Sequence, residues 1–192
     1  MLKLADLENA IAEETAIVSL MWANNETGVL FPVEQIAAVC KSRGVLFHCD
    51  AVQAVGKVPV DLHKLPVSYL SVAGHKIHAP KGIGALFVRR KTPFAPLIYG
   101  GHQERGLRGG TENVPLIAGL GKAAELARKY QPSYGKKVLP LRDALENGIL
   151  EIIPNTERNG HKLQRLANTT NITFHGGRIS ISVGVSMKDM RK

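Results

Sequence analysis

Short apolar runs that are followed directly by polar clusters constrain the fold of this chain most strongly. The runs cover residues 15–22, 45–49, 67–73 and 84–89, and each is rich in β-forming residues. Between the first two runs, residues 32–43 carry apolar side chains at helical spacing, begin with Pro and are followed by Gly. Strand, helix and strand with short connections are typical of a mainly parallel sheet in an α/β fold.

The pattern changes after residue 110. Residues 111–129 predict a long helix that Thr111 could cap. Residues 131–135 (QPSYG) look like a linker, and residues 136–147 predict a second helix. Apolar strands are expected around residues 149–153 and 168–174, and the last fifteen or so residues match neither a strong helix nor a core element. We therefore expect a first domain over residues 1–130 and an incomplete second domain over residues 131–192.

Composition and charge narrow the class of protein. The 192 residues contain no apolar stretch long enough to cross a bilayer, and the acidic N-terminal segment is unlike a secretory signal, which favours the cytoplasm. The net charge of +9 would suit nucleic acid or an anionic cofactor. The basic residues are scattered and only 5% of residues are aromatic, so a solvated basic surface is the better explanation and nucleic acid is not the expected partner.

Thiols and imidazoles do not form a metal-binding pattern. The two cysteines, Cys40 and Cys49, lie in an expected helix and strand and are interpreted as reduced core thiols. His48, His75 and His78 lack a metal-ligand spacing such as HExxH, so no metal site is predicted.

Polar clusters follow three of the apolar runs. They are Asn24–Gly28, His48–Gln53 and Gly74–Lys76, with His78 and Lys81 shortly after. In an open parallel sheet, the loops at the carboxyl ends of the strands form the ligand crevice. These clusters therefore predict a binding site at one edge of the sheet.

The residue types in these clusters suit a carbonyl-bearing cofactor such as pyridoxal phosphate (PLP). Such a cofactor needs a lysine amine, an acid opposite its ring nitrogen, and donors for its phosphate and ring hydroxyl. Lys76, Asp50, His75 and Gln53 could supply these groups in turn. Each has an ordinary alternative, since such a lysine is usually a surface residue, such an aspartate often caps a turn, and the glutamine could face solvent. It is the combination that favours a cofactor site.

Longer blocks in this order carry a resemblance to a known family. Residues 22–28 (WANNETG), 48–57 (HCDAVQAVGK), 74–90 (GHKIHAPKGIGALFVRR) and 100–113 (GGHQERGLRGGTEN) resemble the cysteine desulfurases of the class V aminotransferase-like group. The similarity runs from roughly Thr15 to Phe174. The resemblance implies the central part of a fold type I PLP-dependent large domain over residues 1–130, and a truncated, partial α+β small domain over residues 131–192.

The resemblance also implies roles for individual residues. Lys76 would bond covalently to the cofactor aldehyde and move protons at the substrate α-carbon, while Asp50 would pair with the pyridine nitrogen. Gln53 would hydrogen-bond the ring hydroxyl, and His75 would contact the phosphate.

Further positions follow from the same blocks. Asn25 would lie beside the cofactor, and Thr111 would reach the phosphate of a neighbouring subunit, which implies a homodimer. Arg105 and Arg108 resemble arginines of the active-site rim.

The chain departs from the family pattern in several places. Ala73 stands where the family often has a phosphate-binding serine. The family pattern places two features before Thr15: the phosphate loop and the histidine that stacks on the cofactor ring. It places two more after Phe174: the loop with the sulfur-accepting cysteine and the arginine that binds the substrate carboxylate. None is present, and the resemblance ends at Gly176. A truncated or frame-shifted gene product is the expectation, with a short binding module as the alternative.

The function implied by the resemblance is removal of sulfur from L-cysteine to leave L-alanine, with transfer to a sulfur-acceptor or scaffold protein for iron–sulfur cluster or thio-cofactor assembly. By itself this chain is expected to have little or no such activity. A selenocysteine lyase or another class V enzyme is an alternative. An alternative of a different class is a non-catalytic basic binding module, which the net charge of +9 supports. Another alternative is an unstable remnant that exposes apolar surface.

Overall fold

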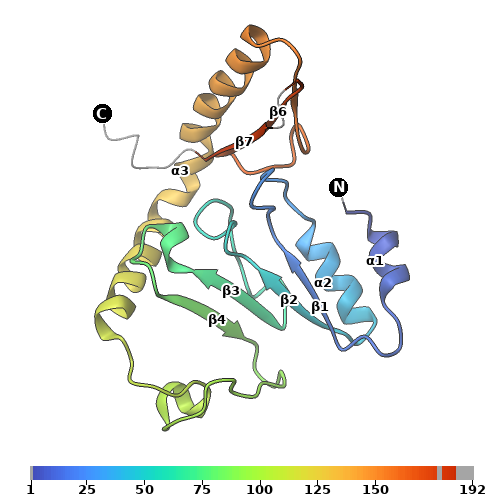
Figure 1. The fold of residues 1–192 in the computed structure, drawn as a ribbon. Coiled ribbons are helices and arrows are strands. Elements are labelled where there is room, and N and C mark those ends of the chain that lie inside the picture. The colour runs from blue at the N-terminus through green and yellow to red at the C-terminus, as the bar shows by residue number, and fades with distance from the viewer. Residues whose placement is uncertain (1, 177–178, 185–192) are drawn as a thin grey trace.

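The computed structural model describes residues 2–176 and 179–184, which form two sheets joined by one long helix (Figure 1). The larger sheet has four strands in the order β1 (Ile17–Met21), β2 (Leu46–Asp50), β3 (Tyr69–Ala73) and β4 (Gly84–Val88). β1, β2 and β3 are parallel, and β4 is antiparallel to β3. Each predicted apolar run therefore forms a strand, and the predicted mainly parallel sheet is confirmed.

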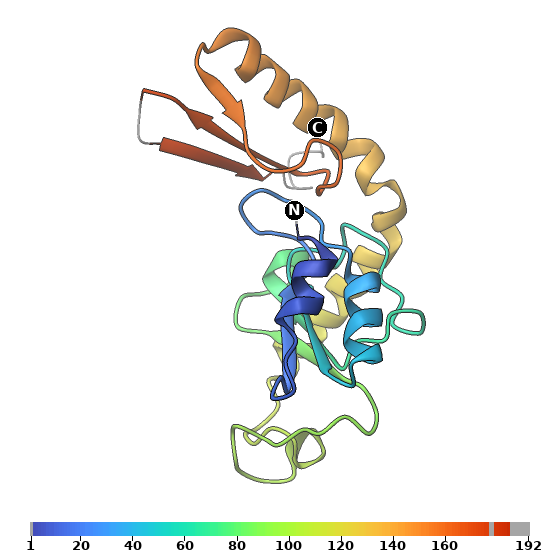
Figure 2. The ribbon, with the colours of Figure 1, turned by 90° about the vertical axis from the view of Figure 1, so that its right-hand side faces the viewer.

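Helices α1 (Leu4–Ala10) and α2 (Val33–Ser42) pack on one side of this sheet (Figure 2). α2 matches the helix predicted over residues 32–43, whereas α1 was not predicted. The core between α2 and the sheet is built from alternate strand residues such as Phe47, Cys49 and Leu70, all at most 2% exposed. The period of two along each strand points the intervening side chains to the other face.

That other face of the large sheet is partly exposed among the described residues. Ile17 of β1 and Leu86 of β4 are each 46% exposed. Between them, His48 of β2 contacts Ser19 Oγ at 2.7 Å through Nδ1 and Ser71 Oγ at 2.8 Å through Nε2, so one imidazole links three strands.

Helix α3 (Val114–Ile152) is a single helix of 39 residues, so the predicted linker over residues 131–135 is wrong. The helices predicted over residues 111–129 and 136–147 are two parts of this one helix. Pro132 and Pro140 lie inside it. The buried residues Tyr134, Val138, Arg142 and Glu146 recur every fourth position, and tertiary packing of this stripe outweighs the local cost of the prolines. The division into domains near residue 131 stays a prediction.

The start of α3 also differs from the prediction. Asn113, not Thr111, is the N-cap, and its side chain accepts a hydrogen bond from Leu116 N at 3.3 Å. The amide of Asn113 takes this role because it stands directly before the first helical residue.

A three-stranded antiparallel sheet packs against the C-terminal half of α3. Its order is β5 (Thr156–Arg158), β6 (Thr169–Phe174) and β7 (Ile179–Gly184). β6 confirms the strand expected over residues 168–174, whereas the strand expected over residues 149–153 is wrong because residues 149–152 complete α3. β5 and β7 were not predicted, and residues 185–192 lie outside the described residues.

A buried carboxylate ties α3 to this smaller sheet. Glu146 accepts hydrogen bonds from Arg165 at 2.6 Å on each oxygen, from Arg158 at 3.1 Å and from Thr170. Burial acts to raise the pKa of Glu146, but these hydrogen bonds outweigh it and lower the pKa to about 2. The ionised carboxylate therefore neutralises the buried guanidinium of Arg165.

The turn after β1 contacts the segment that leads into β6. Leu30 N donates to Gln164 O at 3.0 Å, and Leu166 N donates to Gly28 O at 2.8 Å. Gly28 has φ +72°, and a Cβ there would lie 2.7 Å from Cβ of Thr169. The turn therefore requires glycine both for its conformation and for its contact with β6.

Replacement of Gly28 by alanine is expected to lower the free energy of unfolding by about 2–4 kcal/mol, from the left-handed backbone and the overlap with Thr169 together. Gly44→Ala is the matched control, because Gly44 has φ +68° but nothing lies within 4 Å of its Cβ position. Urea unfolding of both variants measures the difference. Equal losses in the two variants would show that the contact with Thr169 contributes nothing.

Candidate active site

The polar clusters meet at the edge where β1, β2 and β3 end. The register pairs Met21 of β1 with Asp50 of β2, and Asp50 with Ser71 of β3. The turn over residues 24–28, the loop after Asp50 and the 3₁₀ helix η1 (Gly74–Ile77) all follow from this edge. The residues predicted to contact the cofactor, except Thr111, therefore lie on neighbouring connections: Asn25, Asp50, Gln53, His75 and Lys76.

Within the described residues, one of the two carboxylate oxygens of Asp50 is engaged in a hydrogen bond. Oδ1 accepts a hydrogen bond from Val52 N at 2.9 Å, so the side chain does cap the turn after β2. Among the described residues, no other hydrogen bond reaches this half-buried carboxylate, and it forms no ion pair with Lys76. The capping role and a role toward a cofactor are therefore compatible.

Lys76 is held on a tight connection between β3 and β4. Gly74 N donates to Ile83 O at 3.0 Å, and a Cβ on Gly74 would lie 2.9 Å from that same oxygen. Gly74 and Ile77 are buried, while His75 and Lys76 between them are exposed. The burial of the outer pair fixes η1, and Lys76 makes no ion pair within the described part of the chain.

A second lysine, Lys57, lies close to the predicted site. Its Nζ donates to Gln53 O at 2.9 Å and to Gln53 Oε1 at 3.1 Å. Burial, followed by the nearby positive charge of Lys76, lowers the pKa of Lys57 to about 8. Sequence reasoning missed this residue, although the spacing of four between Gln53 and Lys57 within the HCDAVQAVGK block was a usable signal.

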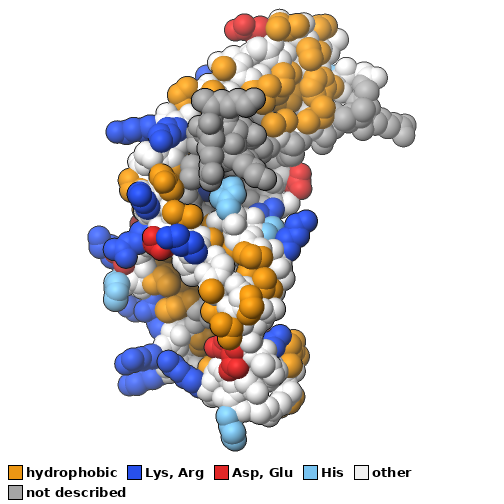
Figure 3. Space-filling model, turned by 90° about the vertical axis from the view of Figure 1, so that its left-hand side faces the viewer, with side chains coloured by type: hydrophobic (Ala, Val, Ile, Leu, Met, Phe, Trp, Pro, Cys, Tyr) orange, Lys and Arg blue, Asp and Glu red, His pale blue; other side chains and the backbone are white. Residues whose placement is uncertain are grey.

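Lys57 and Lys76 both line a groove of about 950 Å³ between the large sheet's loops and α3. The other basic side chains that line it are His78, Lys122 and Lys137, and none of the described residues that line it carries a carboxylate. Figure 3 faces the α3 side of the molecule and shows Lys and Arg side chains gathered there, beside exposed hydrophobic ones. The groove therefore suits an anionic ligand better than a cationic one.

Asn25 occupies an exposed turn that its neighbour Asn24 shapes. Asn24 Oδ1 accepts hydrogen bonds from Glu26 N at 3.0 Å and Thr27 N at 2.9 Å. Asn25 Nδ2 donates to Glu26 Oε1 at 2.8 Å. The turn predicted for these residues is confirmed, and it presents Asn25 at the same edge as Asp50.

Thr111 lies apart from the other predicted residues. It is exposed near the end of the segment 89–113, which extends below the large sheet in Figure 1. Arg105 and Arg108 lie on the same segment, where Arg108 Nη1 donates to Gly109 O at 2.8 Å. The contact of Thr111 with a neighbouring subunit and the rim position of the arginines stay predictions.

The thiols are core residues, as predicted. Cys40 and Cys49 are free and buried. Burial raises the pKa of both, and with the added effect of Asp50 the pKa of Cys49 reaches about 12. No cluster of three or more His, Cys, Asp or Glu side chains that could hold a metal is found in residues 2–176 and 179–184, and none of the helices described there could span a membrane.

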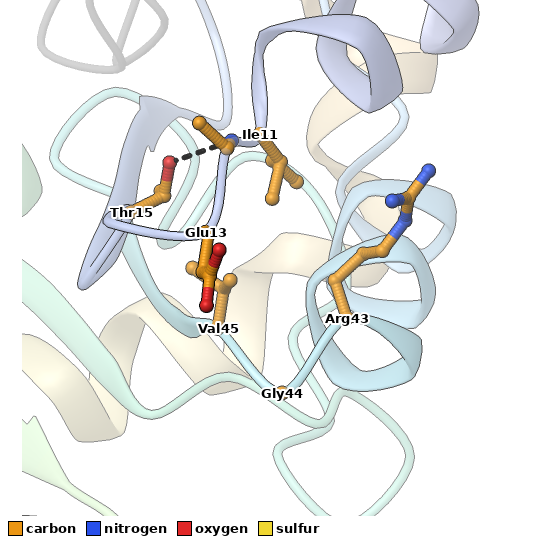
Figure 4. Close-up of a pocket in the computed structure, with 7 residues that line it drawn as sticks. Ile11, Glu13, Thr15, Arg43, Gly44 and Val45 are labelled. Carbon is orange, nitrogen blue, oxygen red and sulfur yellow. Dashed lines mark hydrogen bonds between the residues drawn. The ribbon is translucent and has the colours of Figure 1, made fainter.

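Another groove, of about 430 Å³, lies at the opposite edge of the sheet (Figure 4). It is lined by residues 11–13, Thr15 and residues 43–45, and Ala12 N donates to Thr15 Oγ1 at 3.0 Å. Figure 4 shows the side chains of Glu13 and Arg43 pointing away from each other. Because β1 and β2 begin here, this groove is remote from the polar clusters.

Comparison with known proteins supports the fold. The family model described as Aminotransferase class-V matches residues 1–184. The match begins before Thr15 and continues past Gly176, so the limits of similarity set from the sequence motifs were too narrow. It includes all the predicted site residues.

Named relatives are similar over most of this chain. Cysteine desulfurase 2 of Trichormus variabilis is 58% identical over 171 residues, which cover 89% of this chain and 43% of the relative. Cysteine desulfurase NifS of Azotobacter vinelandii is 52% identical, covering 88% of this chain and 43% of the relative. A solved NifS-like protein superposes with a TM-score of 0.85 at 41% identity, covering 90% of this chain and 47% of that one. The chain thus spans less than half the length of these relatives, and the predicted fold class is confirmed.

Proposed function

The chain belongs to the aminotransferase class-V family, and from that premise we propose that it forms the cofactor-binding core of a PLP-dependent cysteine desulfurase. The substrate would be L-cysteine and the carbon product L-alanine. The observation that carries the proposal is the placement of Asp50 at the end of β2 and of Lys76 just after the end of the neighbouring strand β3. The names of the relatives, cysteine desulfurases at 52% and 58% identity, support the choice of substrate.

The residues present fit the chemical groups of PLP. Lys76 supplies an exposed amine for the aldehyde, and the second oxygen of Asp50 has no partner among the described residues, so it is free for the ring nitrogen. Gln53 Nε2 makes no hydrogen bond within the described residues and could donate to the ring hydroxyl. His75, exposed beside Lys76, suits the phosphate.

When bound, PLP supplies an electron sink that acidifies the α-proton of an amino acid. The chain's own groups would control the protons: the Lys76 amine takes the proton from the substrate α-carbon and returns one to the product. The Asp50 carboxylate holds a proton at the ring nitrogen through its charge. Asn25, at the same edge, would hold the substrate.

The sulfur acceptor does not lie within these 192 residues. Their two cysteines are the buried Cys40 and Cys49, and burial raises the pKa of each thiol away from the range where a thiolate forms. We therefore propose that a thiol from outside these residues takes the sulfur, for delivery to an acceptor or scaffold protein. A homodimer in which Thr111 reaches the partner's cofactor phosphate is part of the same proposal.

Uptake of PLP tests the proposed function. The chain is mixed with an equimolar amount of PLP, reduced with borohydride, and mapped by peptide mass spectrometry. We expect one adduct per chain on the peptide that contains Lys76, because its amine is exposed and unpaired within the described residues. No adduct, or labelling spread evenly over the lysines, would overturn the proposal.

A further inference from the structure

We propose that Lys57 is a positioning residue that fixes the orientation of the Gln53 side-chain amide at the candidate site. The consequence for the cofactor rests on the proposed function, whereas the contact between the two side chains does not. Lys57 itself would not touch the ligand. It would act through Gln53.

The direction of the amide follows from the chemistry of its partner. A lysine ammonium has three donors and no acceptor, so it must face the oxygen end of the Gln53 amide. Nζ lies 3.1 Å from Oε1. With Oε1 engaged, the Nε2 end is the one left to donate, which is the polarity that a ring hydroxyl or its oxyanion requires.

A second contact holds the lysine in place. Nζ also donates to the backbone carbonyl of Gln53 at 2.9 Å. The surrounding backbone is a run of tight turns, in which Val55 N bonds Ala51 O at 3.0 Å and Lys57 N bonds Ala54 O at 2.9 Å. Because one ammonium bridges the main chain and the side chain of the same residue, rotation of Gln53 away from this orientation breaks a hydrogen bond.

Lys57 is desolvated and has no carboxylate partner within the described residues. The titratable groups that line its groove are Lys76 of η1, His78 after it, and four residues of α3: Lys122, Tyr130, Tyr134 and Lys137. Lys122 forms an ion pair with Glu125 at 2.9 Å. Burial of a lysine among basic neighbours costs free energy. The two hydrogen bonds from Lys57 to Gln53 offset part of that cost.

The contact predicts a pH dependence. Burial and Lys76 lower the pKa of Lys57 to about 8, so its ammonium loses a proton as the pH rises through that value. The charge-assisted hydrogen bond to Oε1 is then replaced by a weaker neutral one. The side-chain amide of Gln53 should therefore report a titration with its midpoint near 8.

Nuclear magnetic resonance of the cofactor-free chain tests the contact directly. The Gln53 side-chain amide signals are followed from pH 6 to pH 10 in wild type, in Lys57→Met and in the matched control Lys64→Met, whose lysine side chain is 85% exposed. We expect the titration near pH 8 in wild type and the control, and its loss in Lys57→Met. Identical Gln53 signals in all three proteins would overturn the inference.

Affinity for PLP tests the consequence. Lys57→Met is expected to weaken PLP binding about three- to tenfold, the effect of losing one oriented hydrogen bond, and Lys57→Arg to restore part of it. Affinity of Lys57→Met within twofold of wild type overturns the positioning role. If wild type binds no PLP at all, the proposed function fails instead, and the resonance experiment still decides whether Lys57 orients Gln53.

Discussion

Replacement of Lys76 by alanine should abolish the covalent adduct with PLP, while leaving the free energy of unfolding within about 0.5 kcal/mol of wild type. The adduct requires an amine, and alanine offers none. Lys76 is exposed on η1, and no ion pair or hydrogen bond holds it among the described residues. Its removal therefore breaks no hydrogen bond and no ion pair among the described residues.

Two other lysines sharpen this prediction. Lys81 lies on the same connection between β3 and β4 and is also exposed, so Lys81→Ala is the matched control and should keep the adduct. Lys57 shares the groove and has a pKa of about 8, which favours the reactive neutral amine, but both contacts with Gln53 restrain it. An adduct that persists in Lys76→Ala and maps to Lys57 would show that the groove selects the wrong amine for the proposed function.

The large sheet was predictable because its signals are local. Each apolar run is short and bounded by turn residues, and the helix over residues 32–43 buries Val33, Ile36 and Cys40 as its spacing predicts. Since β1, β2 and β3 are parallel, their carboxyl ends share one edge, and this topology brings the polar clusters together. The sequence could therefore predict that the three polar clusters lie at one edge of the sheet.

The C-terminal half was less predictable because its elements depend on contacts distant in sequence. Pro132 and Gly135 signal a break, yet α3 continues through them because Tyr134 and Val138 are buried. The three-residue strand β5 exists through its pairing with β6, and its own sequence, Thr156–Arg158, carries no alternation long enough to predict it. The sequence did not identify Lys57 as a site residue, because its role depends on its contacts with Gln53. Without a known partner, a lysine is assigned to the surface.

At the candidate site, the structural roles of the residues are compatible with the proposed chemical roles. Asp50 closes the turn after β2 with one oxygen and leaves the other free within the described residues, and Gly74 is packed so that Lys76 is turned outward. The ordinary interpretation of each residue is therefore not an alternative to the functional one. The turn closed by Asp50 and the helix η1 that follows Gly74 hold the Asp50 carboxylate and the Lys76 amine at the ends of the adjacent strands β2 and β3.

Replacement of Glu146 by alanine should lower the free energy of unfolding by about 3–5 kcal/mol at neutral pH, because it leaves a buried cation without its partner. The side chains of Arg165 and Glu146 are 2% and 3% exposed, so the guanidinium would stay buried without its carboxylate partner. Arg158 and Thr170 lose a hydrogen-bond acceptor as well. The segment before β6, which also bonds the turn carrying Asn25, would lose its anchor on α3.

The pH dependence of this loss separates the ion pair from simple packing. Glu146 has a pKa of about 2 in the folded chain against an ordinary value of 4.5, so its contribution is fully present above pH 4.5 and is lost as the pH falls toward 2. The difference between wild type and Glu146→Ala, measured by urea unfolding, should therefore shrink over that interval. Glu151→Ala, an exposed position on the same helix, should cost less than about 0.5 kcal/mol at any pH. A loss in Glu146→Ala that stays constant down to pH 2 would mean that the carboxylate stabilises the fold by its volume, not by its charge.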